Sequence, residues 1–288
     1  MPLDQASRPA FHPLSPGGPM RIASWNVNSI RTRLEQLTSW LVRAAPDVVC
    51  MQETKVEDGS FPEAALSEVG YRSVIFGQKS YNGVAIATRF GLSVDDVKKG
   101  LDGDEQDVAR RMLAATIEGI RVINVYVPNG QAVGTPAFAY KLAWLERLRS
   151  ELEARYRPDQ QIMICGDFNV APEAIDVAEP KKWEGQVLFH PDERAALGRL
   201  MEWGLVDAFR ACHPAKEAYS WWDYRMGAFR RNKGLRIDLA LVTRPLAARC
   251  TDVSIDTRPR ELQRPSDHAP VVVEIADGDA PPGVAPGA

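Results

Sequence analysis

Short apolar runs that end abruptly in acidic or amide side chains constrain the fold of this chain more than any other feature of its sequence. The run VVCM at residues 48–51 is typical of a strand buried on both faces, and it ends at Gln52 and Glu53. A second run, IMIC at residues 162–165, ends in the sequence GDFN at residues 166–169. Loops at the ends of buried strands present side chains on a rigid scaffold, so we expect a functional site where these strands end.

The apolar periodicity predicts many strands and a few helices. Strands are expected at residues 21–27, 48–51, 84–88, 112–117, 120–127, 162–165, 235–242 and 271–275. Helices are expected from Leu34 to the stop at Pro46, and over residues 136–155 and 192–203. These elements do not alternate regularly, which favours a layered α/β fold with sheets packed together over a regular βαβα order.

The length and composition favour one domain between two tails. With 288 residues, 45% of them hydrophobic, the chain can bury one large core. Residues 1–19 and 277–288 are rich in Pro, Gly and Ala, with too few large apolar residues to offset the entropy of ordering them. We expect disordered tails around a domain at residues 20–276, and Met20 is an alternative start of the chain.

The charge balance provides no global attraction to a polyanion. The formal net charge is -3, so any nucleic-acid surface must be local. The four cysteines lack CxxC spacing, which suits a reducing cytoplasm. No stretch reaches the roughly 20 apolar residues that span a bilayer, and the first residues lack the basic and apolar segments of a secretion signal. We therefore expect a cytoplasmic protein without a membrane partner.

Each polar cluster taken alone has a plain structural explanation, because Asp and Asn stabilise turns by bonding their own backbone. Asp238 differs, since a carboxylate inside an apolar strand needs a specific partner. Taken together, the polar residues at the strand borders supply oxygen ligands for a hard cation and a group for proton transfer. They are Asn26, Asn28, Glu53, Tyr126, Asp167, Asn169, Asp238, Asp267 and His268.

Seven short motifs occur in an order that resembles the exonuclease III and abasic-site (AP) endonuclease family. They are WNVNSIR at 25–31, QETK at 52–55, YVPNG at 126–130, GDFN at 166–169, SWWDYR at 220–225, GLRID at 234–238 and PSDHAP at 265–270. The resemblance covers residues 20–276 and implies a DNase I-like four-layer α/β sandwich, with two packed mixed β-sheets flanked by helices. It also implies a metal-dependent DNA-repair nuclease that hydrolyses phosphodiester bonds of duplex DNA at abasic sites and 3′ ends.

The resemblance implies roles for the residues near a metal and an attacking water. Glu53 resembles the family's principal Mg²⁺ ligand, with Asn28 and Asp267 nearby in the metal site and contributing through water, and Mn²⁺ is the alternative ion. Asp167 and Asn169 resemble the pair that positions or deprotonates the water and contacts the phosphate.

The resemblance also assigns catalytic roles to residues that form hydrogen bonds with one another or with the phosphate. Asn26 and Tyr126 resemble the partners of the water-positioning pair. His268 and Asp238 resemble the family's His–Asp pair, in which the carboxylate fixes the ring and the imidazole faces the scissile phosphate. The general base is open between Asp167 and His268.

A DNA-binding face is also implied. Trp221 and Trp222 resemble the aromatic wall that accepts the deoxyribose of an abasic or terminal nucleotide, and a core position is the alternative, more so for Trp222. Arg225 resembles a residue that inserts into the duplex. Local positive charge for phosphate contacts is expected at Arg110, Arg111, Arg230 and Lys233, although each is also typical of a solvated surface charge.

One segment departs from the best-known members of the family. Residues 176–194 are expected to form a wall of the phosphate pocket, where the bulky Leu188, Phe189 and His190 would block an internal phosphate. Such a block would shift activity from abasic-site incision toward 3′ exonuclease or 3′ phosphatase work.

Two other functions fit parts of the pattern. Superfamily relatives that cleave DNA non-specifically, or act on inositol phosphates or sphingomyelin, generally carry a second histidine at the position of Tyr126, and this chain has none there. A non-catalytic DNA-binding module would have lost a metal or water residue, and no motif position is missing. We expect a monomer that acts on double-stranded DNA.

Overall fold

The computed structural model describes residues 18–103 and 109–278, which form two six-stranded sheets and the helices around them. The strands are β1 (Met20–Asn26), β2 (Val48–Gln52), β3 (Tyr71–Phe76), β4 (Val84–Arg89), β5 (Val94–Lys99), β6 (Met112–Ile117), β7 (Ile120–Tyr126), β8 (Ile162–Asp167), β9 (Leu205–Asp207), β10 (Asp238–Thr243), β11 (Cys250–Ile255) and β12 (Val271–Ile275). The α-helices are α1 (Ile30–Ala44), α2 (Glu63–Glu68), α3 (Pro136–Arg155), α4 (Pro180–Trp183), α5 (Pro191–Glu202), α6 (Ala208–Cys212) and α7 (Arg244–Ala247).

Both sheets follow the same internal plan. The first has the strand order β11-β12-β1-β2-β4-β3, and the second has the order β5-β6-β7-β8-β10-β9. Each contains one parallel pair, β1 with β2 and β7 with β8, and its other neighbouring strands are antiparallel. Because the strands of a parallel pair run the same way, the carboxyl ends of β1 and β2 share one edge, as do those of β7 and β8.

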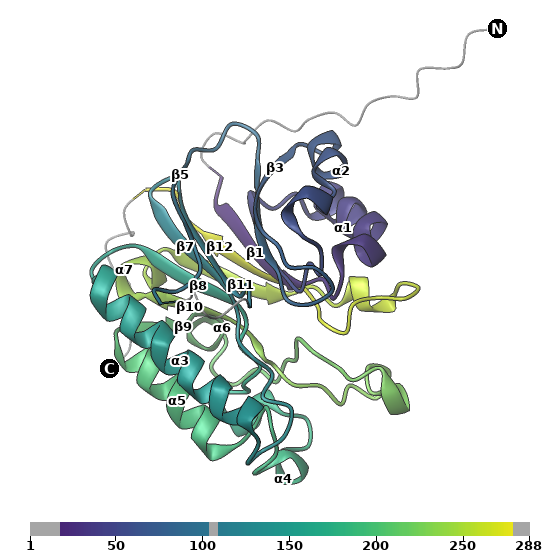
Figure 1. The fold of residues 1–288 in the computed structure, drawn as a ribbon, viewed down its shortest axis with the longest axis vertical. Coiled ribbons are helices and arrows are strands. Elements are labelled where there is room, and N and C mark those ends of the chain that lie inside the picture. The colour runs from purple at the N-terminus through teal and green to yellow at the C-terminus, as the bar shows by residue number, and fades with distance from the viewer. Residues whose placement is uncertain (1–17, 104–108, 279–288) are drawn as a thin grey trace, which may run out of the picture.

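The sheets pack face to face between two layers of helices (Figure 1). Apolar side chains from both sheets, such as Ile86 on β4 and Met163 on β8, share one buried cluster between them. α1 covers the outer face of the first sheet through Leu37 and Trp40. α3 and α5 lie over the second sheet, where Leu148 belongs to a further buried cluster. The predicted four-layer α/β sandwich is confirmed.

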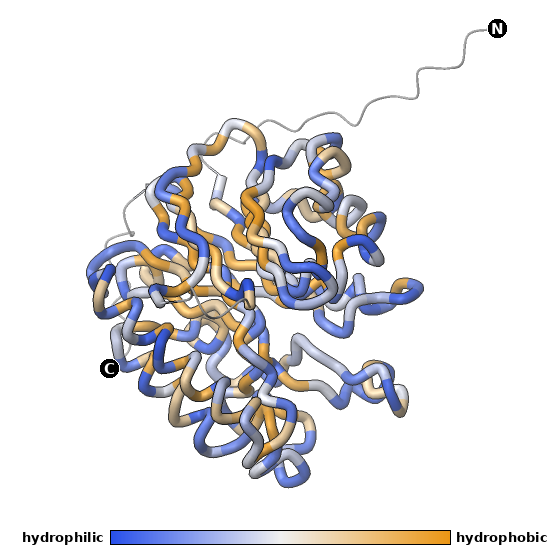
Figure 2. Tube along the Cα trace, in the orientation of Figure 1, coloured by the Kyte–Doolittle hydropathy of each residue, from blue (hydrophilic) through white to orange (hydrophobic). Residues whose placement is uncertain are grey.

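Hydropathy follows these layers. Figure 2 shows hydrophobic segments along the central strands, whereas the outer helices alternate between hydrophobic and hydrophilic residues. This alternation is typical of helices that bury one face and leave the other in water.

Most predicted elements are confirmed to within a few residues at their ends. α3 and β12 occupy the predicted positions. The strand predicted at residues 235–242 starts only at Asp238, because Leu235 pairs in isolated bridges with Val177 and Trp221 instead. The four edge strands β3, β5, β9 and β11 escape the prediction. β5, with the sequence VDDVKK, and β11, with the sequence CTDVSI, carry exposed side chains that interrupt any apolar run, and β9 has only three residues.

The predicted tails at residues 1–19 and 277–288 lie outside the described residues except for 18–19 and 277–278, so they stay predictions. Within residues 18–103 and 109–278, no helix is both long and apolar enough to cross a bilayer.

Candidate active site

Polar residues gather at the edge where the central strands of both sheets end. They are Asn26 at the end of β1, Glu53 after β2, Tyr126 and Asp167 at the ends of β7 and β8, Asp238 at the start of β10 and His268 before β12. In the register of the second sheet, Asp167 lies opposite Tyr126 on one side and Asp238 on the other. The topology thus brings together the residues that the sequence placed at strand borders.

The backbone turns sharply beside these side chains. Glu53 (φ 50°) and Asn169 (φ 52°) adopt the left-handed conformation. For residues other than glycine this conformation costs about 1–3 kcal/mol and is concentrated at functional sites. Gly166 lets β7 and β8 approach closely next to Asp167, because a Cβ atom at Gly166 would lie 1.9 Å from the carbonyl oxygen of Val125.

Asn26 connects the carboxylates of the two sheets. Its side chain is buried, and Nδ2 donates to Oε1 of Glu53 at 2.8 Å and to Oδ2 of Asp167 at 2.9 Å. The Asn26 Oδ1 atom accepts from the backbone N–H of Asn28 at 3.0 Å, which fixes the amide orientation. One amide group therefore holds two carboxylates side by side.

His268 and Asp238 form a buried pair beside these carboxylates. His268 Nδ1 lies 2.9 Å from Oδ2 of Asp238 and 3.1 Å from its Oδ1, and Ser220 Oγ donates to the same Oδ2 at 2.6 Å. The other ring nitrogen, Nε2, lies 3.7 Å from Oδ2 of Asp167. Asp238 thus aims Nε2 at the cluster that contains Asp167 and Glu53.

The charges of this cluster shift two pKa values in ways that suit proton chemistry. Burial raises the pKa of Asp167 to about 7, although the imidazolium of His268 opposes the rise. Burial lowers the pKa of His268, but the carboxylates of Asp238 and Asp167 outweigh it and raise this pKa to about 10. Asp167 is therefore the group poised to exchange a proton near neutral pH, while His268 stays cationic.

Asn169 is held by the loop after β7. Its backbone N–H donates to Oδ1 of Asp167 at 2.9 Å, and its Nδ2 donates to the carbonyl oxygen of Val127 at 3.0 Å. Asn129 Nδ2 donates to the Oδ1 atom of Asn169 at 2.9 Å. The exposed Asn129 and the buried Asn169 therefore form one amide pair at the edge of the site.

Tyr126 is a half-buried phenol beside the carboxylates. Burial raises its pKa well above the ordinary value, and the charges of Glu53 and Asp167 add to the rise. The guanidinium of Arg111 lies 4.7 Å from the centre of the Tyr126 ring. Tyr126 therefore stays a neutral hydrogen-bond donor, as expected of a partner to the acidic groups.

Asn28 and Asp267 lie in an adjoining hydrogen-bonded group. Asn28 Nδ2 donates to Oδ1 of Asp267 at 2.9 Å, and Trp221 Nε1 donates to its Oδ2 at 2.9 Å. Lys55 Nζ connects this group to the carboxylates, since it lies 2.5 Å from Oδ1 of Asn28 and 2.8 Å from Oε2 of Glu53. The sequence analysis assigns Lys55 no role, although its place two residues after Glu53 in the QETK motif is a usable signal.

The donor set suits a hard divalent cation. Glu53, Asp167 and His268 each offer one ligand atom, and these atoms lie within 4.8 Å of one another. Because His268 is held as a cation and Asp167 is poised for proton exchange, the carboxylate of Glu53 is the better ligand of the three, and oxygen donors suit Mg²⁺. Glu53 is thus common to this group and to the metal site expected from the sequence.

The aromatic and basic residues expected to contact DNA differ in their exposure. Trp221 is half-buried, with its ring centre 6.3 Å from that of Trp183. Trp222 is only 2% exposed and packs against Phe229, which favours the core alternative for this residue. Of the basic side chains expected to contact DNA, Arg110, Arg225, Arg230 and Lys233 are exposed, and Arg111 is half-buried.

The three expected wall residues differ in placement. Leu188 and Phe189 are buried in an apolar cluster with Leu235. His190 keeps part of its surface, caps α5 by accepting from the Asp192 N–H at 3.1 Å, and packs against Phe138. His190 is therefore the one member of this trio with a side chain open to solvent.

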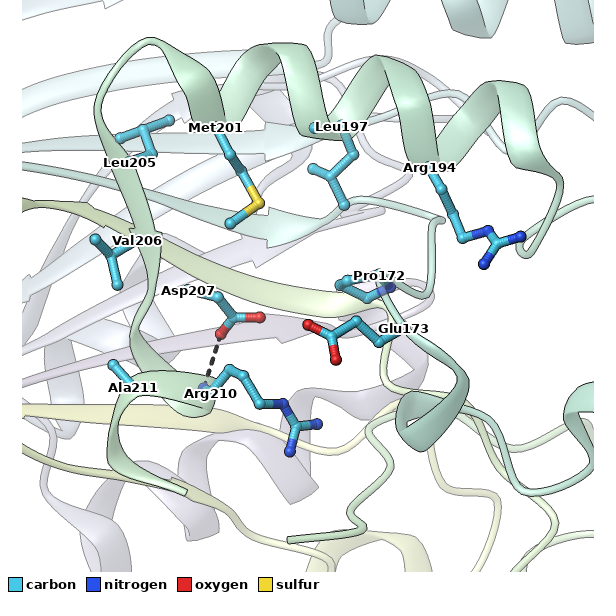
Figure 3. A pocket seen from close by; sticks show the side chains of 11 residues that line it. Pro172, Glu173, Arg194, Leu197, Met201, Leu205, Val206, Asp207, Arg210 and Ala211 are labelled. Atoms are coloured by element: carbon cyan, nitrogen blue, oxygen red, sulfur yellow. Dashed lines mark hydrogen bonds between the residues drawn. The ribbon is translucent and has the colours of Figure 1, made fainter. Parts of the chain in front are cut away.

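A cavity of about 480 Å³ lies elsewhere, between α5, β9 and α6 (Figure 3). None of the site residues lines it. Two of its charged groups form ion pairs, since Asp207 lies 2.7 Å from Arg236 and Arg210 lies 2.5 Å from Asp176. The cavity belongs to a structural ion-pair network rather than to the site at the strand ends.

Several known proteins resemble this chain over most of its length. A sequence profile of the Endonuclease/Exonuclease/phosphatase family matches residues 23–268. Exodeoxyribonuclease III of Haemophilus influenzae is 37% identical over 268 residues, which covers 89% of this chain and 100% of that protein. The structure of an AP endonuclease from Archaeoglobus fulgidus has a TM-score of 0.85 at 45% identity and covers 90% of this chain and 100% of its own. The 3′ phosphatase NExo from Neisseria, bound to a product DNA hairpin, has a TM-score of 0.85 at 42% identity, with 89% and 99% covered.

The profile match and the geometry of the strand-end site place the chain in the endonuclease/exonuclease/phosphatase family. Within this family the chain belongs to the exonuclease III and AP endonuclease group of DNA-repair nucleases, which confirms the resemblance carried by the seven motifs.

Proposed function

We propose that this protein is a Mg²⁺-dependent phosphodiester hydrolase that incises duplex DNA at abasic sites and trims 3′ ends. One observation carries the proposal: Asn26 Nδ2 donates to Glu53 at 2.8 Å and to Asp167 at 2.9 Å, so carboxylates from the two sheets share one amide. His268, fixed by Asp238, lies beside them. This arrangement unites a cation ligand, a proton acceptor and a positive charge in one place.

The proposed chemistry follows from the charges of the individual groups. Asp167, with a pKa of about 7, takes a proton from the attacking water. His268, with a pKa of about 10, donates from Nε2 to a non-bridging phosphoryl oxygen and offsets the negative charge that develops there. Asn169 adds an amide contact to the phosphate. As the water oxygen bonds to phosphorus, the bond from phosphorus to the 3′ oxygen breaks. Glu53 would hold the Mg²⁺ ion, which would stabilise the charge on the phosphoryl oxygens and on the leaving 3′ oxygen.

Both activities are part of the proposal because the relatives include an AP endonuclease and a 3′ phosphatase. Leu188 and Phe189 are buried, which leaves His190 as the residue able to obstruct an internal phosphate. The ratio of the two activities therefore depends on His190. Duplex DNA binds along the exposed basic side chains, which are Arg110, Arg225, Arg230 and Lys233.

The direct test uses two labelled duplexes, one with an internal abasic site and one with a recessed 3′ end, each incubated with Mg²⁺ or with EDTA. We expect cleavage of both in Mg²⁺ and of neither in EDTA. His190→Ala should raise incision at the abasic site relative to 3′ trimming. Equal cleavage with EDTA would contradict the metal requirement, and an unchanged ratio in His190→Ala would contradict the role of this side chain.

Point variants test the assigned residues. Asp167→Asn and His268→Ala should each lower kcat by about 10²–10⁴-fold, the usual contribution of a proton-transfer or charge-stabilising group. Two matched controls lie away from the site, at the exposed Asp159 and at the half-buried His213, which bonds Val253 on β11. Asp159→Asn and His213→Ala should leave kcat unchanged. Near-normal turnover in either site variant would refute the role proposed for that residue.

We also propose that the enzyme acts as a cytoplasmic monomer. All four cysteines are free, as suits a reducing compartment. Size-exclusion chromatography with light scattering should give a single species near 31.9 kDa, and a stable dimer would contradict the monomer.

A further inference from the structure

A fully buried lysine lies under the amide pair of the site. Lys141 is in the second turn of α3, and its side chain is 0% exposed. Its ammonium group donates to the carbonyl oxygen of Asn129 at 3.1 Å and to that of Asn169 at 2.6 Å. A third contact goes to the carboxylate of Glu193, which is also 0% exposed. Three ammonium protons thus meet three acceptors, and the group is fully satisfied.

These three acceptors come from three different segments. Asn129 belongs to the loop after β7, Asn169 to the loop after β8, and Glu193 to the first turn of α5. The second carboxylate oxygen of Glu193 accepts from the backbone N–H of His190 at 3.1 Å, which extends the connection to the expected wall of the phosphate pocket. Lys141 therefore ties together the loops after β7 and β8 and the first turn of α5.

The loop after β7 is also built around the Lys141 stem. Gly130 has a φ of +88°, and a Cβ atom there would lie 3.0 Å from Cδ of Lys141. The close approach of this loop explains a glycine directly after Asn129. The YVPNG motif thus positions its asparagine against the buried lysine.

A buried ion pair of this kind is a poor way to stabilise a fold. Taking both charges out of water costs about as much as their attraction returns, and apolar residues of similar volume often serve equally well. What apolar residues cannot do is bond two loop carbonyls at once. The pair is therefore better explained by the geometry that it imposes than by stability.

We propose that Lys141, held by Glu193, is a positioning residue that fixes the Asn129–Asn169 amide pair for contact with the phosphate. Asn129 Nδ2 donates to Oδ1 of Asn169 at 2.9 Å, and both backbone carbonyls are anchored on the same ammonium group. The inference rests on the proposed function for its catalytic consequence, because Asn169 is assigned there to the phosphate.

The test compares Lys141→Met, the double variant Lys141→Met/Glu193→Leu, and a matched control. The double variant removes the whole pair and so leaves no buried carboxylate without a partner, which keeps it foldable if the single variant is not. Lys98→Met is the control, because Lys98 lies 3.3 Å from the 4% exposed carboxylate of Glu151 but contacts no residue of the site.

We expect both Lys141 variants to lower kcat about 100-fold, because displacement of a reacting or binding group by about 1 Å has an effect of this size. KM should change less than about threefold, since the amide pair contacts one phosphate among many. Lys98→Met should keep the wild-type kcat. A double variant with wild-type kcat would overturn the proposal, and so would a loss seen only in KM.

A second measurement does not depend on activity. Amide hydrogen exchange of residues 127–131 and 167–171 should be about tenfold faster in the double variant than in wild type, and unchanged in Lys98→Met. Unchanged exchange in these segments would overturn the positioning role. If the wild-type protein cleaves neither duplex, the proposed function fails, and the exchange experiment still decides whether Lys141 orders the two loops.

Discussion

A buried polar network joins the two sheets just behind the site, and it permits a quantitative prediction. Asn124 lies on β7, and its Nδ2 donates to the carbonyl oxygens of Met51 and Ala85 on the other sheet, both at 2.9 Å. Its Oδ1 accepts from Nε2 of Gln52 at 2.8 Å. Because Glu53 directly follows Gln52, this network fixes the position of the end of β2, and of Glu53, relative to the second sheet.

The perturbation is Asn124→Leu, which keeps the approximate size of the side chain but removes its polar atoms. Three hydrogen bonds are lost at once, and the partners on Met51, Ala85 and Gln52 stay buried. Gln52 Nε2 keeps its bonds to Ser24 and Cys50, whereas the carbonyl oxygens of Met51 and Ala85 lose Asn124. A buried polar group left without a partner costs about 1–3 kcal/mol, so the two carbonyl groups give an expected loss of about 2–6 kcal/mol in the free energy of unfolding. Domains are stable by only about 5–15 kcal/mol in total, so the variant should be severely weakened.

Urea unfolding followed by fluorescence measures this loss. Ser24→Ala is the graded comparison, because Ser24 Oγ accepts only one bond of the same network, from Gln52 Nε2 at 3.0 Å. Ser24→Ala should lower the free energy of unfolding by about 1 kcal/mol. If Asn124→Leu destabilises the protein no more than Ser24→Ala does, the network does not join the sheets as described.

Two further predictions concern buried and half-buried charges. Arg236 lies 2.7 Å from both Asp176 and Asp207. Arg236→Met should therefore lower the free energy of unfolding, measured in urea, by about 3–5 kcal/mol. A decrease below about 1 kcal/mol would contradict a structural role for this ion-pair network. Burial raises the pKa of Asp256, but bonds from Arg258 and Trp40 outweigh it and lower this pKa from 3.8 to about 2. The stabilisation by ionised Asp256 is thus fully present above pH 3.8 and is lost as the pH falls through 2, so the advantage of wild type over Asp256→Asn in thermal unfolding should shrink steadily across that range. An advantage at pH 2 as large as that above pH 3.8 would contradict this assignment.

Much of the fold was accessible from the sequence because its central strands are buried on both faces. The runs before Gln52 and Gly166 are continuous and apolar, and they become β2 and β8. The edge strands give no such signal, since exposed side chains break the pattern in β5 and β11 and β9 has only three residues. The late start of β10 at Asp238 was also hidden, because pairing of Leu235 with Trp221 is a tertiary contact that no local pattern records.

The sequence likewise predicts some residues of the candidate site and not others. Strand borders and motif order pointed to Glu53, Asp167 and His268, and these three converge. The hydrogen bond from Asn26 to Asp167 spans 141 residues of chain, and no local spacing could predict it. Lys141 was missed for another reason: a lysine in a helix is ordinarily exposed, and only tertiary packing buries it.

The convergence of both sheets on one cation is the central claim, and anomalous diffraction from crystals grown with Mn²⁺ tests it most directly. We predict an anomalous peak within about 2.6 Å of a Glu53 carboxylate oxygen, next to Asp167 and His268. The peak should be absent from crystals of Glu53→Gln. A strong peak elsewhere on the protein, with none between Glu53 and Asp167, would contradict the account.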